Sequence, residues 1–177
     1  MDTNITPPLG LSWDRCLCLF CQVFLVCRSM PITINPIGII RTSLIEKAQA
    51  PIQSARSQVS GIAEVYDAFV AGLEGIEEFS HIYLVYYFHQ SRPEFALRVQ
   101  PFLDNKQHGV FATRYPVRPN AIGFSVVQLT HRQDNLLYFN GADMLNETPL
   151  LDIKPYIPEF DIFSVDKIGW YQNRSSQ

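Results

Sequence analysis

The segment Ser80–His89, with the sequence SHIYLVYYFH, restricts the possible folds more than any other part of the chain. Its residues are almost all apolar or aromatic, which predicts a β-strand that is buried on both faces. Other segments rich in β-branched and aromatic residues lie at 32–42, 61–65, 109–114, 122–132 and 136–145. Gln133–Asn135 fits a hairpin turn between the last two of these segments.

Helical signals are scarce in this chain. Residues 66–79 favour a short helical stretch, and two glycines interrupt it. The 177 residues are 47% hydrophobic and 18% charged, so the chain can bury a hydrophobic core and is not expected to be disordered. Many short strands with little helix predict a mainly β fold: a single compact β-barrel, closed or nearly closed, with one or two short helices.

The first 29 residues differ from the rest of the chain. They contain all four cysteines, in and around an apolar run at Leu17–Val26. This run is too short to span a bilayer comfortably, its flanks do not fit a signal peptide, and the cysteine spacing is irregular for a metal site. We therefore expect a poorly ordered or non-native leader of doubtful function at 1–29, a barrel domain at 30–170 and a tail at 171–177. On this hypothesis Met30 is the functional start.

The charge is unevenly distributed along the sequence, although the formal net charge is only −3. Residues 61–80 contain five acidic residues and no Lys or Arg, whereas residues 92–132 contain six basic residues and two acidic ones. A basic centre in an acidic chain can form a local patch that faces phosphate. Solvated surface charges without a partner would give the same pattern, and both interpretations stay open here.

Several common catalytic motifs are missing from the sequence. No Gly-x-Gly-x-x-Gly follows a predicted strand, and no Walker loop, His-Glu-x-x-His or nucleophile elbow occurs. A Rossmann-type cofactor fold therefore has no support. Histidine is also sparse, with four residues, which weakens a metallohydrolase interpretation. We expect no metal site and no membrane association.

Two segments in the middle of the chain look suited to function. At residues 88–90 an apolar strand ends in His89 and Gln90, whose side chains can donate and accept hydrogen bonds. Residues 109–125 hold Arg114 and Arg118, planar cations suited to carboxylate or phosphate, each close to a proline. A strand end that reaches water, and ordinary surface arginines, are the alternative interpretations. Gly123 in the same segment would let a ligand approach the backbone.

A third segment covers residues 141–158. Asn146–Pro149 is typical of a polar turn. Strand alternation after the turn places Asp152, Lys154 and Tyr156 on one face, and Leu151 and Ile153 on the other. An ion pair between Asp152 and Lys154 on a solvated sheet face is the alternative to a functional role.

The order and spacing of five blocks resemble the TsaA/TrmO-like family of transfer RNA methyltransferases, which act on threonylcarbamoyladenosine beside the anticodon. The blocks are IGIIRTS, PIQ, GLEGIEEFSHIYLVYYFHQ, GVFATRYPVRPNAIGFS and TPLLDIKPYIP, from about Ile37 to Tyr156. The resemblance implies a cytoplasmic homodimer that uses S-adenosyl-L-methionine to methylate the exocyclic amine of the modified adenosine in tRNA. The substrate and the cofactor come from this resemblance alone.

The resemblance also implies which residues of this chain carry the function. The cofactor contacts would be Pro51, Ile52, Gln53, His89, Gln90, Arg114, Phe124, Asn146, Glu147, Thr148 and Pro149. Among these, Arg114 suits the methionine carboxylate of the cofactor and Phe124 offers an apolar wall. Candidates for RNA binding are Arg118, Arg132 and Lys154. A carbamoylated amine is a poor nucleophile and needs help to lose its proton, for which the candidates are Asp143, Asp152 and Tyr156.

The chain also departs from the family pattern. Asn146 and Glu147 stand where the family usually has Asp-Gly, and Ala121 replaces a proline. The missing glycine matters if the turn needs a positive φ, although Asn146 tolerates a positive φ better than most residues do. We expect the Glu147 side chain to point outward, because an unpaired inward carboxylate would be costly. Two other functions stay open: a cofactor-sensing or RNA-binding barrel without catalysis, and a methyltransferase for another substrate.

Overall fold

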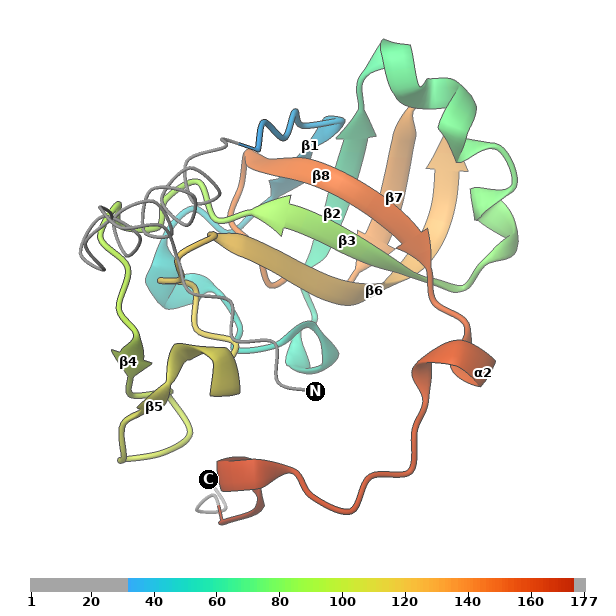
Figure 1. Ribbon diagram of the computed structural model, residues 1–177. Coiled ribbons are helices and arrows are strands. Elements are labelled where there is room, and N and C mark those ends of the chain that lie inside the picture. The colour runs from blue at the N-terminus through green and yellow to red at the C-terminus, as the bar shows by residue number, and fades with distance from the viewer. Residues whose placement is uncertain (1–31, 174–177) are drawn as a thin grey trace, which may run out of the picture. The chain divides into compact units, whose positions relative to one another are not determined.

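Six antiparallel strands form a closed barrel in the order β1-β2-β7-β6-β3-β8, in which β8 pairs with β1 (Figure 1). The structure is a computed structural model that describes residues 32–173. A separate two-stranded sheet joins β4 and β5. The strands are β1 (Gly38–Thr42), β2 (Ser60–Val65), β3 (His81–Tyr87), β4 (Arg98–Val99), β5 (His108–Gly109), β6 (Ile122–Gln133), β7 (Leu136–Asn140) and β8 (Thr148–Pro155). The predicted mainly β barrel is confirmed.

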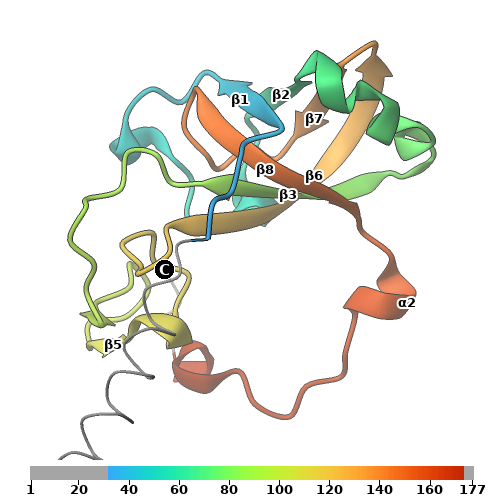
Figure 2. The same cartoon turned by 45° about the horizontal axis from the view of Figure 1, so that its top comes forward.

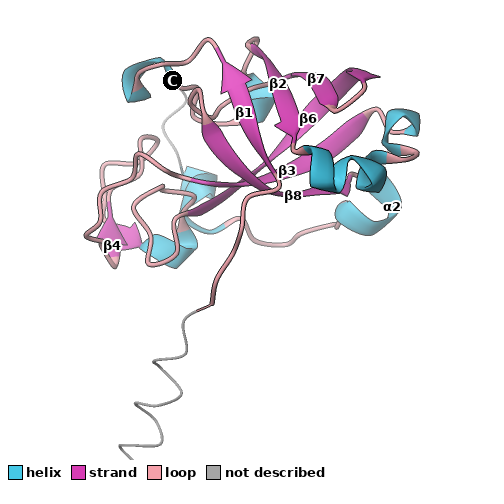
Figure 3. Ribbon diagram, turned by 90° about the horizontal axis from the view of Figure 1, so that it is seen from above, coloured by secondary structure: helices cyan, strands magenta, loops and turns pink. Residues whose placement is uncertain are grey.

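The helices within the described part of the chain are all short (Figure 3), and most are of the 3-10 type. They are η1 (Lys47–Gln49), η2 (Ser54–Arg56), η3 (Asp67–Leu73), η4 (Ile76–Glu78), η5 (Val110–Ala112), α2 (Pro158–Asp161) and η6 (Gly169–Asn173). The predicted helical stretch at 66–79 is found as η3 and η4, which Gly75 separates with a φ of 78°. Within residues 32–173 no helix is long and apolar enough to cross a membrane. The leader proposed at 1–29 lies outside the described residues, as does most of the tail at 171–177.

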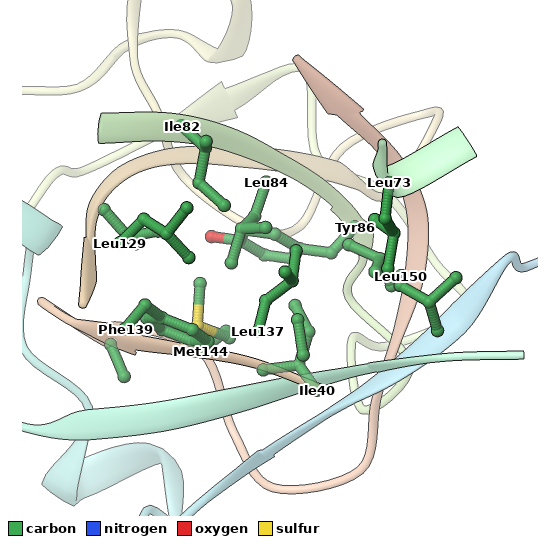
Figure 4. Packing of buried hydrophobic residues seen from close by; sticks show 14 residues of the cluster. Ile40, Leu73, Ile82, Leu84, Tyr86, Leu129, Leu137, Phe139, Met144 and Leu150 are labelled. Carbon is green, nitrogen blue, oxygen red and sulfur yellow. The ribbon is translucent and has the colours of Figure 1, made fainter. Parts of the chain in front are cut away.

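The core fills the inside of the barrel with the alternate residues of each strand. From β3 it receives Ile82, Leu84 and Tyr86, and Figure 4 shows these converging with side chains from the other strands. Burying a side chain such as Leu84 completely stabilises the fold by about 1.5–3 kcal/mol. The prediction that β3 is buried on both faces was wrong. Tyr83 is only half-buried and Tyr87 is exposed, since the outer face of the barrel is only partly covered.

The strand predicted at 109–114 was also wrong. β5 ends at Gly109, and the chain then turns through η5. Thr113 closes this turn, because its N–H and its hydroxyl both donate to the carbonyl of Val110, at 3.1 and 2.9 Å. A threonine that bonds back three residues competes with the sheet ladder, which the apolar pattern of the segment does not reveal.

Each of the six barrel strands has one terminus at the same end of the barrel, which we call the open end. The cross-strand pairs at this end are Thr42 with Gly61, Ser60 with Asn140, Tyr87 with Ile122 and Ile40 with Thr148. The loops that follow β1, β3 and β7 and those that precede β2, β6 and β8 therefore all start or finish there. Segments that are far apart in sequence can meet at this end.

A C-terminal arm, residues 156–173, leaves the barrel after β8 and returns beside the β4–β5 hairpin (Figure 2). Trp170 fastens it there, since its indole N–H donates to the carbonyl of Ala112 at 2.7 Å and its ring stacks on His108 at 5.1 Å between ring centroids. Several apolar side chains of the arm are exposed: Phe160, Ile162, Phe163, Val165 and Ile168.

Gly123 has a packing role, and not the ligand approach expected from the sequence. It lies on the inward face of β6, and an added Cβ atom would lie 2.5 Å from the ring of Tyr86 and 2.7 Å from the ring of Phe88. These two rings meet edge to face, with 5.4 Å between their centroids. The missing side chain therefore makes room for an aromatic pair at the open end.

We expect Gly123→Ala to lower the free energy of unfolding by about 1–3 kcal/mol, the usual cost of overpacking a core. For a chain of this size, each kcal/mol lowers Tm by roughly 2–4 °C, which calorimetry can measure. Gly109→Ala is the matched control, because φ is −60° there and no atom lies within 4 Å of the added Cβ. Equal Tm values for the two variants would contradict this account of Gly123.

Candidate functional site

The first group of residues at the open end surrounds Arg114. Its Nη1 donates a hydrogen bond to Oε1 of Gln53 at 2.7 Å, and its guanidinium carbon lies 5.1 Å from the centroid of the Phe124 ring. Phe124 is half exposed at the start of β6, and Ile52 is also partly exposed beside Gln53. The structure thus brings together three of the predicted cofactor contacts, which come from the loop of residues 51–53, the loop after η5 and β6.

A second group lies where β3 ends and β8 begins. The Thr148 hydroxyl donates to the carbonyl of Leu145 at 2.7 Å, and Nδ1 of His89 lies 3.4 Å from the same hydroxyl oxygen. Burial lowers the pKa of His89, and the charge of Glu147 opposes this effect. His89 is therefore a neutral imidazole at pH 7, with one nitrogen to donate and one to accept.

The turn at 146–149 is tied to the end of β1. The side-chain oxygen of Asn146 accepts the N–H of Thr42 at 3.1 Å, and the Asn146 N–H donates to the carbonyl of Leu44 at 2.7 Å. Pro149 is already part of β8 and pairs with Ile39. The turn thus has one fixed position relative to the barrel.

Glu147, at the position where the family usually has glycine, holds the positive φ of this turn, at 61°. Its side chain is 64% exposed, and its carboxylate lies 3.9 Å from the guanidinium of Arg41. The Glu147 side chain points outward, as expected from the cost of an unpaired inward charge. The turn keeps a glycine-like conformation without a glycine.

Two further residues at the open end could not be recognised from the sequence. Lys47, in η1, donates from its ammonium group to the carbonyl of Gln90 and so ties the β1–β2 connection to the end of β3. Ser125 donates to the carboxylate of Asp143 at 2.6 Å, inside the barrel wall. Burial raises the pKa of Asp143, and the hydrogen bond from Ser125 opposes the shift. The contacts of Lys47 and Ser125 span 43 and 18 residues, so no local pattern reveals them.

The other two candidates for a base lie along β8. Asp152 accepts from Lys154 at 2.7 Å, which supports the alternative of a surface ion pair for both residues. Leu151 is not packed against the core with Ile153 as alternation predicted, because a register shift opposite Val85 and Tyr86 puts Leu150 inside instead.

Tyr156 belongs to a row of aromatic rings on the outside of the barrel. Its ring lies 5.7 Å from Tyr83, whose ring in turn lies 6.3 Å from that of Phe124. His81 continues the row beyond Tyr156, at 6.3 Å between ring centroids. The row therefore leads from the Arg114 group along the outer wall.

The structure does not gather the basic candidates into one patch. Arg118 donates from Nη1 to the carbonyls of Thr113 at 2.9 Å and Tyr115 at 3.3 Å, so it braces the loop that carries Arg114. Arg132 instead donates to the carbonyl of Leu73 at 2.9 Å, at the opposite end of β6. Arg118 precedes the start of β6, whereas Arg132 lies near the other end of this strand.

The residues at the open end fit S-adenosyl-L-methionine, the cofactor that the family resemblance implies. The Arg114 guanidinium matches a carboxylate, and the exposed ring of Phe124 gives an apolar wall. The neutral His89 and the polar backbone of the 146–149 turn can pair with the edge of a base. Among residues 32–173 no group of three His, Cys, Asp or Glu side chains could hold a metal ion.

Several known proteins are similar to this chain in sequence or in structure. A probable S-adenosyl-L-methionine-binding protein of Pyrococcus abyssi is 50% identical over 139 residues, which cover 78% of this chain and 75% of that protein. The human tRNA (adenine(37)-N6)-methyltransferase is 35% identical over 134 residues, 72% of this chain but only 30% of that enzyme. The crystal structure of TrmO from Pseudomonas aeruginosa superposes with a TM-score of 0.68 at 37% identity, over 83% of this chain and 66% of that chain.

The sequence profile of one family covers most of the barrel and the start of the C-terminal arm. It matches residues 39–162 and describes the tRNA-methyltransferase O N-terminal domain. The match starts in β1 and ends just after α2, so it includes every loop at the open end. The resemblance found in the sequence is confirmed, and the chain belongs to the family of the tRNA-methyltransferase O N-terminal domain.

Proposed function

We propose that this protein is an S-adenosyl-L-methionine-dependent methyltransferase that acts on tRNA. Its substrate is the exocyclic amine of threonylcarbamoyladenosine next to the anticodon. The observation that carries the proposal is the meeting of Arg114, Gln53 and Phe124 at the open end, from three segments distant in sequence. The names of the relatives support it, since they include S-adenosyl-L-methionine-binding proteins and tRNA (adenine(37)-N6)-methyltransferases. A cytoplasmic location is part of the same proposal.

The chain's main task in this reaction is to orient its ligands. The cofactor supplies a methyl group that its sulfonium already activates, so rate comes largely from alignment. Gln53 fixes the Arg114 guanidinium, which can then bind a carboxylate as a charge-assisted pair. The Phe124 ring, which lies over the guanidinium, would shield one side of this arginine–carboxylate pair from water and so strengthen the ion pair.

Proton removal from the acceptor amine needs a separate group. Asp152 is engaged by Lys154, and Tyr156 lies in the outer aromatic row. Asp143 is at the open end but already accepts from Ser125. All three stay proposals for the base, and a pH–rate profile of each Ala or Phe variant would identify the residue whose loss removes the acid limb.

The homodimer is also part of the proposal. The apolar side chains exposed on the C-terminal arm, such as Phe160 at 65% and Phe163 at 76%, form a surface that a second copy could bury. The aromatic row beside Phe124 offers a further apolar strip close to the site. Light scattering at micromolar concentration distinguishes a dimer from a monomer.

We expect Arg114→Ala to weaken S-adenosyl-L-methionine binding by about tenfold or more, because a charge-assisted hydrogen bond is lost. Methyl transfer to tRNA that carries the threonylcarbamoyl group should fall at least as much. Calorimetry and mass spectrometry of modified nucleosides measure the two effects. Arg98→Ala, at the exposed position of β4, is the control and should bind normally. Unchanged affinity in a folded Arg114→Ala variant would remove this residue from the site.

The mass spectrometry also separates the alternatives. Cofactor binding without transfer to any RNA would favour a sensor. Transfer to tRNA that lacks the threonylcarbamoyl group would favour another substrate of the same fold.

RNA binding should be electrostatic, and Lys154 is the basic candidate that lies on the outer wall. We expect Lys154→Glu to weaken tRNA binding severalfold, on the order of one lost phosphate contact, and to leave cofactor affinity unchanged. Rising salt should weaken the wild-type complex steeply. Fluorescence anisotropy with labelled tRNA measures both, with Lys167→Glu on the C-terminal arm as control. Binding that does not respond to salt would favour a small-molecule substrate.

Arg118 and Arg132 are less suitable to test, because both side chains donate hydrogen bonds to backbone carbonyls within the protein.

Glu147→Gly should stabilise the protein without changing its ligands' affinity. An L-residue at φ 61° costs about 1 kcal/mol or more, which glycine avoids in part. We expect Tm to rise by about 2–4 °C. Asp134→Gly relieves a φ of 54° in the β6–β7 turn, far from the site, and is the matched control. A large gain in cofactor or RNA affinity in Glu147→Gly alone would show that Glu147 repels the ligand.

A further inference from the structure

Large apolar side chains are exposed along the β4–β5 segment, residues 91–119, which lies outside the barrel within the connection from β3 to β6 (Figure 2). Phe102 is 74% exposed and Phe111 is 75% exposed, so neither ring belongs to the core. Phe95 and Leu97 of the same segment are exposed as well. Several large apolar side chains left uncovered on one short segment indicate a surface that binds a partner.

Two of these exposed rings are supported by another side chain. Phe102 stacks on Tyr115, with 6.0 Å between the ring centroids and 28° between the ring planes. The guanidinium carbon of Arg118 lies 6.0 Å from the centroid of the Phe111 ring. Because both rings are also largely exposed, each presents a flat apolar surface to the solvent.

Arg118 joins the two supports into one unit. Its Nη1 donates to the carbonyls of Thr113 at 2.9 Å and Tyr115 at 3.3 Å. The N–H of Tyr115 in turn donates to the hydroxyl of Thr113 at 3.2 Å. An unbroken series of contacts therefore runs from Phe102 through Tyr115 and Arg118 to Phe111. Since these contacts are made within the protein itself, little conformational entropy is lost when a partner binds.

The supported rings belong to the same loop as the cofactor group. Arg114, whose guanidinium donates to Gln53 at 2.7 Å, is the residue before Tyr115. The start of the β4–β5 segment is tied to this loop too, because the hydroxyl of Ser91 donates to the carbonyl of Pro116 at 3.2 Å. A partner that lies on the rings is thus brought next to the arginine proposed for the cofactor.

The charge of the β4–β5 segment favours RNA as this partner. The segment contains five basic residues and two acidic ones. One of the acidic residues, Asp104, is engaged within the hairpin, since its carboxylate accepts from Nε2 of His108 at 2.7 Å and from the N–H of Lys106 at 3.2 Å. RNA brings phosphates for the positive charge and unpaired bases whose flat faces stack on aromatic rings. A second copy of this chain would instead bring the same positive charge to the surface, which opposes its binding there.

We propose that Phe102 and Phe111 are stacking platforms for unpaired bases of the anticodon loop beside the nucleotide that is methylated. This inference rests on the proposed function. Stacking on an aromatic ring tolerates any base, so the platforms select an unpaired loop over a paired stem. Stacking also releases no counterions, whereas each contact with a phosphate does. The platforms therefore add to RNA affinity without adding to its salt dependence.

The test measures the affinity for a labelled anticodon stem-loop RNA by fluorescence anisotropy over a range of salt concentrations. We expect Phe102→Leu and Phe111→Leu each to weaken binding by about five- to tenfold, the scale of one lost base stack, with an unchanged salt slope. Leucine keeps an apolar side chain but removes the flat ring. Phe102→Tyr and Phe111→Tyr restore the ring and should bind as the wild type does. Tm should stay the same in all four variants, because both rings are exposed.

Two controls separate stacking from a general loss of affinity. Phe69→Leu makes the same change at a ring that is 44% exposed in η3, which follows β2 at the end of the barrel away from the open end. It should bind the stem-loop normally. A fully paired RNA of the same length offers no unpaired base, so the leucine variants should bind it as the wild type does. Calorimetry should give an unchanged affinity for S-adenosyl-L-methionine in every variant.

Wild-type affinity for the stem-loop in both leucine variants would overturn the platforms and leave the proposed function standing. Tyrosine variants that bind as weakly as the leucine variants would also overturn them, because the flat ring would then not be the cause. So would a change from dimer to monomer in the leucine variants, measured by light scattering, since a second copy would then cover the rings. A wild-type protein that binds no RNA would overturn the proposed function, and this inference with it.

Discussion

The pairing of β1 with β8 is the interaction on which the candidate site depends. It closes the barrel through the register of Ile40 with Thr148 and Ile39 with Pro149, and so places the 146–149 turn beside the end of β1. Without this closure the Asn146 side chain would not reach the backbone of Thr42, over a separation of 104 residues. The edge strands of an open sheet would also leave N–H and C=O groups unpaired. Closing the barrel thus completes the sheet and assembles the site in one step.

The sequence predicts the strands of this barrel far better than the loops at its open end. Strand segments carry a periodic apolar signal, and β3 and β6 were found close to their predicted limits, whereas β7 ends at Asn140 within the segment predicted at 136–145. The loops carry no such signal, which is why the turn at Val110–Ala112 was predicted as a strand. The faces of β3 were also misjudged, because His81–Tyr87 is apolar on a side that faces outward.

The candidate site divides in a similar way. Its residues could be named because short blocks such as those at 51–53 and 146–149 resemble those of a known family, and the structure then brought Gln53, Arg114 and Phe124 together. The interactions that position these residues could not be predicted. The contact of Lys47 with Gln90 joins segments that only the closed barrel places side by side.

The position of Asp143 suggests why the site and the core are built from the same strands. Phe124 and Ser125 are neighbours on β6, so one faces the site on the outer wall and the other faces Asp143 inside. A shift of β6 by a single residue would exchange these faces, and its pairing with β3 over seven residues prevents such a shift. The inward ring of Tyr86 occupies the space that Gly123 leaves, which fixes the register from within. Core packing therefore determines which side chains of β6 reach the ligand side, and the packed barrel fixes the positions of these side chains.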